Sequence, residues 1–379
     1  MAGAAVIPVI RPWLGEEEAE AAAAVVRSGW VAQGPRVAEF EREFARHIQA
    51  GHGVAVSSCT TALHLGLHVL GVGPGDEVVV PSFSFIATAN AVRYAGATPV
   101  FADVDALTGN LTPQSIEAVA TPRTRAVIGV HQGGVPFDVA AVAQLCDRLG
   151  AALLEDAACA AGSTYRGKPV GAGGGLAAWS FHPRKLLTTG EGGMLTTSDP
   201  DQAARMRRLR EHGMSTSAAD RHQSAAVVLE EYDEVGFNYR MTDMQAAIGL
   251  VQLAKLDQVI TRRRELAARY HEALARVDGL RTVADPEHGT TNYQSFWVVL
   301  PDTFAGTNVD VLTALAERGV SARRGIMAAH LEPAYRGVAA DLPVTEHLTQ
   351  RSVVLPLFHT MTLDEQDDVV AALTEVLKD

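Results

Sequence analysis

The sequence predicts an α/β fold, with a mostly parallel, seven-stranded sheet in a large domain and a smaller α+β domain at the C-terminus. Two observations carry this prediction: short β-branched apolar runs recur along the chain, and amphipathic helical patterns lie between several of them. Strands that alternate with helices form parallel sheets covered on both faces. We place the large domain at residues 1–250 and the small domain at residues 251–379.

Seven apolar runs are the predicted strands of the large sheet. Each run is short and does not alternate between apolar and polar residues, as expected of a strand that is buried on both faces. The runs are residues 54–56, 78–80, 99–102, 126–130, 151–154, 177–181 and 194–197.

Helical patterns separate several of these strands. Each pattern closes near a glycine, as helices often do. The patterns cover residues 60–70, 86–94 and 139–149, and the glycines are Gly71, Gly96 and Gly150. A longer helix is predicted from about residue 242 to residue 277, with Thr242 as its N-cap. The smaller domain then contains an apolar strand at residues 295–300 and a final helix at residues 363–377.

Composition restricts the class of protein. The chain has 379 residues, of which 47% are hydrophobic and 20% charged, which is ordinary for a globular protein. A net charge of −12 without a long basic run argues against nucleic-acid or anionic-membrane partners. No apolar stretch approaches the ~20 residues of a membrane span, and the N-terminus lacks a signal-peptide pattern. Cys59, Cys146 and Cys159 fit neither a disulfide framework nor a zinc site, so we expect a cytoplasmic protein.

Lysine is rare in this chain, and one lysine lies in the unusual stretch SFHPRKLLTTGEGG, residues 180–193. The 32 basic residues include only four lysines: Lys168, Lys185, Lys255 and Lys378. Arginine is the better bidentate clamp, but only the lysine amine can lose its proton near neutral pH and act as a nucleophile. Lys185 therefore indicates a site that needs an amine, with an ordinary surface lysine as the simpler alternative.

Polar side chains follow the predicted strands at the edge where α/β sheets bind ligands. Thr60 and Thr61 open a helix after the strand at 54–56, where hydroxyls and N–H groups bind phosphate. Simple capping of the helix is the alternative for both threonines. Asp156 follows the strand at 151–154 and needs a cationic partner, either a ligand or an arginine.

An aromatic pair and a serine complete this group of residues. Phe83 and Phe85 follow the strand at 78–80 and are either core residues or a platform for a ligand. Ser180 comes directly after residues 177–179 of the strand predicted at 177–181, and it could equally be a turn residue, as could Gly190, Gly192 and Gly193. A lysine amine, a carboxylate, an aromatic face and a phosphate cup together fit pyridoxal phosphate.

Each group has a distinct role toward this cofactor. A carboxylate keeps the pyridine nitrogen protonated, so the ring can accept electrons from the substrate. The lysine amine binds the aldehyde and afterwards moves the proton. Burial and the nearby cationic ring would lower the pKa of Lys185.

Other nucleotide and metal sites are not supported by the motifs. The glycine-rich segment 71–75 follows a helix and precedes a strand, the wrong context for a dinucleotide fingerprint. The run 173–175 has no lysine in P-loop register, and the chain contains no H-E-x-x-H or paired-cysteine metal pattern.

Seven sequence motifs follow one another in a definite order along the chain. They are GWVAQGP (29–35), SSCTTALHLGL (57–67), GPGDEVVVPSFSFIATANAVRYAGATPVFADVD (73–105), EDAA (155–158), SFHPRKLLTTGEGGM (180–194), GFNYRMTDMQAAIG (236–249) and GIMAAHLEPAYR (325–336). With these motifs the chain resembles, over nearly its whole length, the sugar aminotransferases of the DegT/DnrJ/EryC1/StrS group. The resemblance implies a pyridoxal-phosphate enzyme of fold type I, in the aspartate aminotransferase superfamily.

The resemblance also implies roles for particular residues. Lys185 matches the lysine that forms the Schiff base, Asp156 the partner of the pyridine nitrogen, and Phe85 the aromatic residue stacked on the ring. The residues that match phosphate contacts from the same subunit are Thr60, Thr61 and Ser180.

Asn238 resembles the asparagine that reaches the phosphate in the neighbouring subunit, which implies a homodimer with shared active sites. His330, Arg240 and Trp30 are the candidate substrate contacts. A solvated loop histidine is the alternative for His330, and simple packing is the alternative for Trp30.

Three residues depart from the family pattern. Cys59 replaces the usual glycine of the phosphate loop and is expected to shift it. Cys159 stands where glutamine or histidine commonly contacts the phenolic oxygen of the cofactor, and a thiol is a weak hydrogen-bond partner. Ala161 replaces a frequent histidine.

Lys185 also bears on the type of reaction. The sugar 3-dehydratases of this family have histidine at its position, so lysine favours transamination. We expect transfer of an amino group from L-glutamate or L-glutamine to a nucleotide-linked keto-sugar, and the SFHPRK…TTGEGG variant is similar to enzymes that aminate C4. The alternatives are a cyclitol or other non-nucleotide ketone of secondary metabolism, or a non-catalytic regulator with the same fold.

Overall fold

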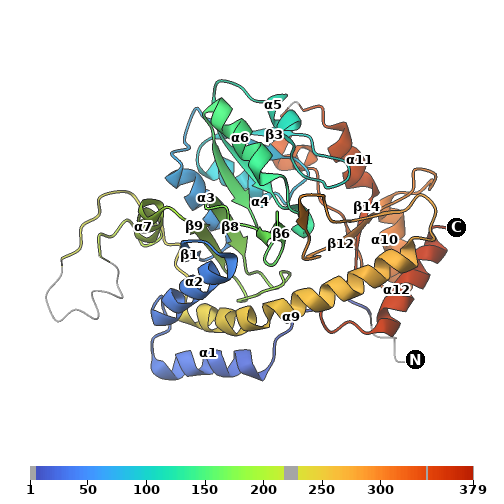
Figure 1. The fold of residues 1–379 in the computed structure, drawn as a ribbon, viewed down its shortest axis with the longest axis horizontal. Coiled ribbons are helices and arrows are strands. Elements are labelled where there is room, and N and C mark those ends of the chain that lie inside the picture. Colours follow the sequence, from blue (N-terminus) through green and yellow to red (C-terminus); the bar gives the residue numbers. More distant parts are fainter. Residues whose placement is uncertain (1–5, 217–228, 339, 379) are drawn as a thin grey trace.

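The computed structural model describes residues 6–216, 229–338 and 340–378, and its centre is a seven-stranded sheet (Figure 1). The strand order is β1-β9-β8-β5-β4-β2-β3, and β9 alone runs antiparallel to its neighbours. The mostly parallel sheet and its seven predicted strands are thereby confirmed. The strands are β1 (His52–Val56), β2 (Glu77–Pro81), β3 (Thr98–Ala102), β4 (Thr124–Val130), β5 (Ala152–Asp156), β8 (Leu176–Ser180) and β9 (Gly193–Thr197).

Helices cover both faces of this sheet. In the described ranges the α-helices of both parts of the molecule are α1 (Glu16–Ser28), α2 (Pro35–Ile48), α3 (Cys59–Val69), α4 (Ala87–Tyr94), α5 (Pro113–Glu117), α6 (Val139–Leu149), α7 (Pro200–Leu209), α9 (Asp243–Leu274), α10 (Asn308–Glu317), α11 (Pro343–Arg351) and α12 (Leu363–Val376), of which α10 packs on β13 and β14 of the C-terminal part. In β2, Val78 and Val80 pack with α3 and α4, whereas Val79 packs on the opposite face with α6 and α9. Burial on both faces explains why the strands are continuous apolar runs.

Helix α9 is the longest element and runs along one side of the molecule (Figure 1). Its N-cap is Thr242, as predicted, and the Thr242 hydroxyl accepts a hydrogen bond from the backbone N–H of Gln245 at 3.3 Å. Helices α1 and α2 pack on its first half, and α12 packs near its end. Because α9 continues through residue 250, the division into domains at that residue stays a prediction, and its position falls inside a helix.

The C-terminal part contains a second sheet, of order β10-β12-β14-β13, in which all pairs are antiparallel. Its strands are β10 (Arg281–Thr282), β12 (Phe296–Val299), β13 (Arg323–Arg324) and β14 (Ser352–Leu355). The sequence predicted only β12 of these, together with α12. A third sheet consists of β11 (Gly289–Thr290), β6 (Thr164–Tyr165) and β7 (Lys168–Pro169), so it joins the C-terminal part to the large sheet's connections.

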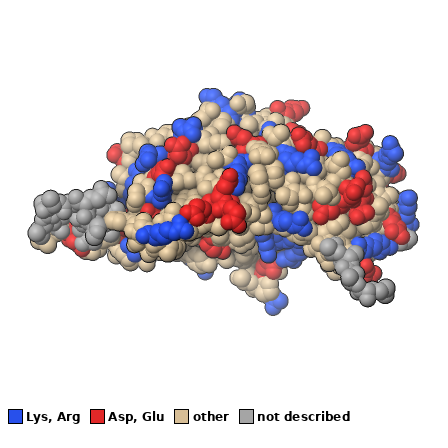
Figure 2. All heavy atoms as spheres, turned by 90° about the horizontal axis from the view of Figure 1, so that it is seen from below, with Lys and Arg blue, Asp and Glu red and all other residues tan. Residues whose placement is uncertain are grey.

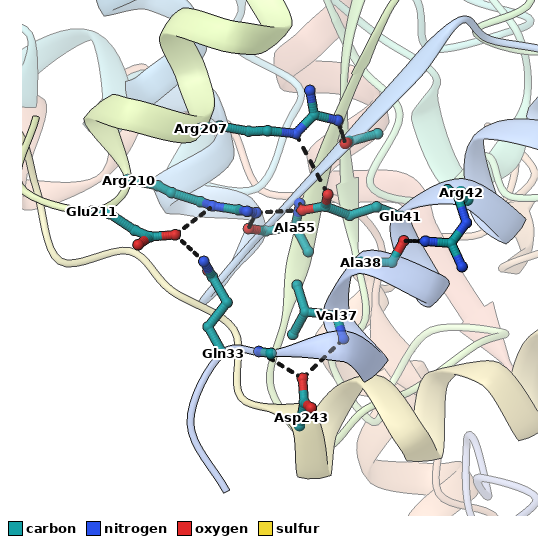
Figure 3. A network of polar contacts seen from close by, with 12 residues as sticks. Gln33, Val37, Ala38, Glu41, Arg42, Ala55, Arg207, Arg210, Glu211 and Asp243 are labelled. Atoms are coloured by element: carbon teal, nitrogen blue, oxygen red, sulfur yellow. Dashed lines mark hydrogen bonds and ion pairs between the residues drawn. The ribbon is translucent and has the colours of Figure 1, made fainter. Parts of the chain in front are cut away.

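A polar network anchors α2 against its surroundings (Figure 3). The Asp243 carboxylate, on the first residue of α9, accepts hydrogen bonds from the backbone N–H groups of Gly34 at 2.8 Å and Val37 at 2.9 Å. The buried carboxylate of Glu41 pairs with Arg210 at the end of α7 and also accepts from the N–H of Ala55. The network therefore ties α2 to α9, α7 and β1.

The ring of Trp30 packs against Gly34, the N-cap of α2. The indole Nε1 of Trp30 donates to the carbonyl of Gln33 at 3.1 Å, and its ring lies against Gly34. A Cβ atom at Gly34 would lie only 1.9 Å from Nε1 of Trp30, so only glycine fits.

Charged side chains of both signs are intermixed on the face shown in Figure 2. Within the described ranges, no helix combines the length and the apolar character that crossing a bilayer requires.

Candidate active site

One cavity collects most of the predicted site residues. It has a volume of about 340 Å³ and lies between the carboxyl ends of the large sheet's parallel strands and the C-terminal sheet. Its lining includes Ser58, Cys59, Thr60, Phe85, Asp156, Cys159, Ser180, Arg184, Lys185, Gln294 and Arg323. The volume is within the range of small-molecule sites, and the position is the one expected of α/β sheets.

Lys185 lies in the connection between β8 and β9, and its amine faces a thiol. The Nζ atom donates a hydrogen bond to Sγ of Cys159 at 3.1 Å. Burial lowers the pKa of Lys185, but Cys159, Cys59 and Asp156 together outweigh burial and raise this pKa above its ordinary value. The predicted lowering by burial is present, but without the cationic ring the cysteines and Asp156 reverse the direction of the net shift.

Gln294 holds the backbone on both sides of Lys185. Its Nε2 atom donates to the carbonyl of Arg184 at 2.7 Å, and its Oε1 atom accepts from the N–H of Leu186 at 3.1 Å. The Gln294 side chain is buried, and its amide satisfies the backbone carbonyl and N–H groups that a neighbouring β-strand would otherwise pair with. Sequence reasoning missed Gln294 because it lies far from Lys185 along the chain and belongs to no local motif.

Asn292 does the same for the segment that contains Cys159. Its buried amide donates to the carbonyls of Cys159 and Ala161, each at 2.8 Å. Its Oδ1 atom accepts from the backbone N–H of Gln294 at 2.7 Å, so the two amides form one connected unit.

Asp156 ends β5 and is buried in the floor of the cavity. Its carboxylate accepts hydrogen bonds from the Thr88 hydroxyl at 2.9 Å and the Ala158 N–H at 3.2 Å. Burial raises the pKa of Asp156 despite these bonds and the nearby Lys185 and His131. In the described ranges it forms no ion pair with an arginine, so that structural alternative is wrong. A protonated pyridine nitrogen is the kind of cation that this carboxylate lacks.

The N-terminus of α3 forms the opposite end of the cavity. Ser58 is the N-cap, and its hydroxyl accepts from the N–H of Thr61 at 3.2 Å. In return, the Thr61 hydroxyl accepts a hydrogen bond from the Ser58 N–H at 3.1 Å. Thr61 does not line the cavity. For Thr61 the capping alternative therefore describes its contacts, and the S-x-x-T spacing of a capping box could have revealed it. Thr60 and Ser180 do line the cavity, and their contacts with a phosphate stay a prediction.

The two phenylalanines take different positions. Phe83 is buried in the core, whereas Phe85 is 65% exposed and lines the cavity. An exposed aromatic face beside Lys185 and Asp156 is suited to stacking on a flat ring.

Cys59 also borders this site. Burial raises the pKa of Cys59 well above its ordinary value, Asp156 and Cys159 raise it further, and Lys185 opposes them. We therefore expect Cys59 to stay a neutral thiol at neutral pH.

Asn238 and Arg240 do not line the cavity of their own chain. Asn238 is exposed, although the backbone around it is held firmly: Phe237 donates to Leu209 at 2.6 Å, and Tyr239 donates to Arg210 at 3.0 Å. A fixed backbone with an exposed side chain is compatible with a role in a neighbouring subunit, which stays a prediction.

His330 lies outside the cavity and is not solvated. Its side chain is only 4% exposed, with Nδ1 at 2.6 Å from the Ser82 hydroxyl and Nε2 at 3.3 Å from the Glu346 carboxylate. The alternative of a solvated loop histidine is therefore wrong. His330 fastens the short helix η2 (Ala329–Leu331) to the end of β2, and Trp30 likewise packs away from the cavity.

The residues in this cavity fit pyridoxal phosphate. Lys185 supplies an amine, Asp156 a buried carboxylate without a cationic partner in contact, Phe85 an aromatic face, and the start of α3 with Ser180 a site for phosphate. No group of acidic, histidine and cysteine side chains within the described ranges could hold a metal ion.

Comparison with known proteins decides the family. The family model of the DegT/DnrJ/EryC1/StrS aminotransferase family matches residues 12–374. The chain belongs to this family. It is therefore a pyridoxal-phosphate-dependent aminotransferase, and solved relatives include forms with pyridoxal phosphate and with pyridoxamine phosphate.

Individual relatives align along almost the whole chain. The spore coat polysaccharide biosynthesis protein SpsC of Bacillus subtilis (strain 168) is 39% identical over 378 residues, which cover 98% of this chain and 97% of SpsC. The structure of the aminotransferase TlmJ from Streptoalloteichus hindustanus is 39% identical with a TM-score of 0.89, covering 98% of this chain and 99% of TlmJ. That of DesV from S. venezuelae, in complex with a ketimine intermediate, is 34% identical with a TM-score of 0.90, covering 99% and 100%.

Proposed function

We propose that this aminotransferase moves an amino group from L-glutamate, or L-glutamine, to C4 of a nucleotide-linked keto-sugar. The observation that carries the proposal is the cavity that contains both the Lys185 amine and the Asp156 carboxylate. A sugar acceptor is supported by relatives such as SpsC, named for polysaccharide biosynthesis, and PseC of Helicobacter pylori, an aminotransferase in pseudoaminic acid biosynthesis.

The protein's own groups divide the work of such a reaction. When bound, pyridoxal phosphate supplies a ring that accepts electrons from the substrate. Asp156 would hold the proton on the ring nitrogen, and Phe85 would orient the ring by stacking. The Lys185 amine would hold the cofactor's aldehyde and then move a proton at the reacting carbon of each substrate. Cys159, at 3.1 Å from Nζ, would help to position the amine for this role.

A homodimer is part of the proposal. Asn238 is exposed and outside its own cavity, and we propose that it reaches the cofactor phosphate of the second subunit. Arg240, two residues further on, would then lie near the sugar in that site.

Absorbance tests the enzymatic part. Purified protein with pyridoxal phosphate should absorb near ~420 nm, and glutamate should bleach this band as the amine is transferred. The Lys185→Arg variant keeps the charge and should not form the band. A protein that stays colourless with added cofactor would support a non-catalytic regulator instead.

The acceptor is tested with the form of the enzyme that has reacted with glutamate. A panel of nucleotide 4-keto-sugars, nucleotide 3-keto-sugars and free cyclitol ketones is added, and recovery of the ~420 nm band is followed. Recovery with the 4-keto-sugars alone is expected. Recovery only with a cyclitol ketone would show that the acceptor carries no nucleotide.

A further inference from the structure

Among the arginines that line the active-site cavity, Arg184 and Arg323 are exposed and, in the described ranges, have no carboxylate partner, whereas the buried Arg263 donates its hydrogen bonds to backbone carbonyls. Arg184 directly precedes Lys185, and Arg323 lies in β13 of the C-terminal sheet. Both side chains are exposed at the mouth of the cavity, and neither forms an ion pair within the part of the chain that the structure describes. The protein has a net charge of −12, so most of its cationic side chains could find an acidic partner. Arginines that remain unpaired beside a reactive lysine would attract an anionic ligand.

The cations at this mouth lie close enough to affect one another. Burial lowers the pKa of Arg323, and the neighbouring charges of Arg184 and Arg324 lower it further. Burial also lowers the pKa of His182; Glu191 opposes this effect, whereas Arg184, Lys185 and Arg323 add to it. Positive charge is thus concentrated on this side of the cavity.

Two acidic groups lie near these arginines. Glu332 contacts Arg324, another arginine that lines the cavity, at 3.3 Å. Glu191 faces His182 at 3.9 Å, and its side chain is 65% exposed. Among the described residues, Arg184 and Arg323 are left as the exposed, unpaired arginines of this cavity.

Both arginines are presented by fixed backbone. The carbonyl of Arg184 accepts the 2.7 Å hydrogen bond of Gln294, and the N–H of Arg184 donates to Nδ1 of His182 at 3.2 Å. Arg323 is opposite Val354 in the antiparallel pair of β13 and β14. Because the backbone of each arginine is already fixed, binding of an anion to its guanidinium group costs less conformational entropy.

We propose that Arg184 and Arg323 form an anion subsite that holds the diphosphate of the nucleotide-linked substrate. The identity of this ligand rests on the proposed function. A diphosphate carries its negative charges on two directly linked phosphates and matches two neighbouring guanidinium forks, whereas the two carboxylates of glutamate are separated by three carbon atoms. Because the pair lies at the mouth, the nucleotide would extend toward solvent while the sugar reaches Lys185.

The experiment measures binding of inorganic pyrophosphate to the enzyme loaded with pyridoxal phosphate, whose own phosphate would occupy the start of α3. Calorimetric titrations compare the unchanged protein with Arg184→Gln, Arg323→Gln and the matched control Arg324→Gln, whose arginine is already paired with Glu332. Each of the first two changes should weaken pyrophosphate binding about 10-fold or more, as expected for loss of one charge-assisted contact. The control should change it less than about 3-fold. Circular dichroism and the ~420 nm band confirm that every variant is folded and loaded.

A second titration, with glutarate, separates the two possible sources of the anion. Glutarate has the two carboxylates of the amino donor but no amine. If Arg184→Gln and Arg323→Gln weaken glutarate binding and leave pyrophosphate binding unchanged, the pair recognises the donor and the proposal is wrong. Equal weakening by all three variants would also overturn it, because only the general charge would then matter. Failure of glutamate to bleach the band would contradict the proposed function without affecting the pyrophosphate result.

Discussion

The Lys185 amine lies 3.1 Å from the Cys159 thiol, to which it donates a hydrogen bond. Cys159 raises the pKa of Lys185 through its electrostatic interaction with the amine and through this hydrogen bond. The thiol therefore influences how much of the lysine is present as the reactive neutral amine.

Replacing Cys159 by alanine should lower the pKa of Lys185. A larger fraction of the amine would then be neutral at a given pH, so the cofactor-free protein should bind pyridoxal phosphate faster in weakly alkaline buffer. The rate of appearance of the ~420 nm band, measured against pH, should have its midpoint at lower pH in Cys159→Ala. Cys146→Ala, a change of a buried cysteine in the core, is the control and should leave the midpoint in place. An upward shift in Cys159→Ala would contradict the assigned direction.

Gln294→Leu should loosen the segment that carries Lys185. The change removes the bonds to the Arg184 carbonyl and the Leu186 N–H, at a cost of about 1–3 kcal/mol for the unsatisfied backbone groups. We expect the visible circular dichroism of the bound cofactor to weaken, and kcat to fall about 10-fold or more while KM changes little.

Two further variants show whether this effect is positional. Gln294→Glu keeps the acceptor for Leu186 but lacks the donor for Arg184, so its dichroism should be intermediate. Gln366→Leu also removes a buried amide donor, to the Leu266 carbonyl, and should lower stability without changing the dichroism. If Gln294→Leu and Gln366→Leu gave the same visible dichroism, Gln294 would contribute to stability alone and would not position Lys185.

Asp156→Asn should change stability and activity in opposite directions. Because the pKa of Asp156 is raised on folding, the folded cofactor-free protein binds the proton more tightly than the unfolded chain. Stability is therefore lost as the pH rises from the unfolded pKa, about 3.9, through the higher folded value. The neutral amide avoids this loss, so Asp156→Asn should be the more stable protein at pH 7 in urea unfolding without cofactor. Its transamination should fall by about 100-fold or more, because the ring nitrogen would lose the partner that keeps it protonated. A less stable cofactor-free variant would refute the assigned direction.

Asp243→Ala should weaken the start of α2. The Asp243 carboxylate accepts from the N–H groups of Gly34, Arg36 and Val37, and removing such a cap costs about 1–2 kcal/mol. Urea unfolding of the cofactor-free protein measures the loss. Asp243→Asn keeps one oxygen acceptor and should lose less, whereas equal losses would show that the hydrogen bonds are not the cause.

Much of the fold could be predicted from the sequence because its signals are local. The buried strands are continuous apolar runs, and helices such as α6 and α9 show their periodicity and caps within a few residues. Strands of two residues, such as β6 and β11, have no period to detect, and they exist only because segments far apart in sequence meet.

The reactive residues of the site could also be predicted from the sequence, whereas the contacts that position them could not. Lys185, Asp156 and Phe85 could be found because chemistry restricts the residue type, and the structure brings them to one cavity. The burial of His330 and the amide of Gln294 beside Lys185 depend on contacts across the molecule, which spacing does not encode.

The paired amides of Asn292 and Gln294 have a consequence for any attempt to divide the chain. Every side chain assigned to the cofactor precedes residue 250, yet the backbone of the Cys159 and Lys185 segments is held in place by groups that follow residue 290. A fragment cut between these positions would retain the full set of reactive groups and lose the frame that aims them. Engineering that exchanges the C-terminal part between relatives must therefore preserve the contacts of residues 292–294, since these residues position cofactor-binding groups that all precede residue 250.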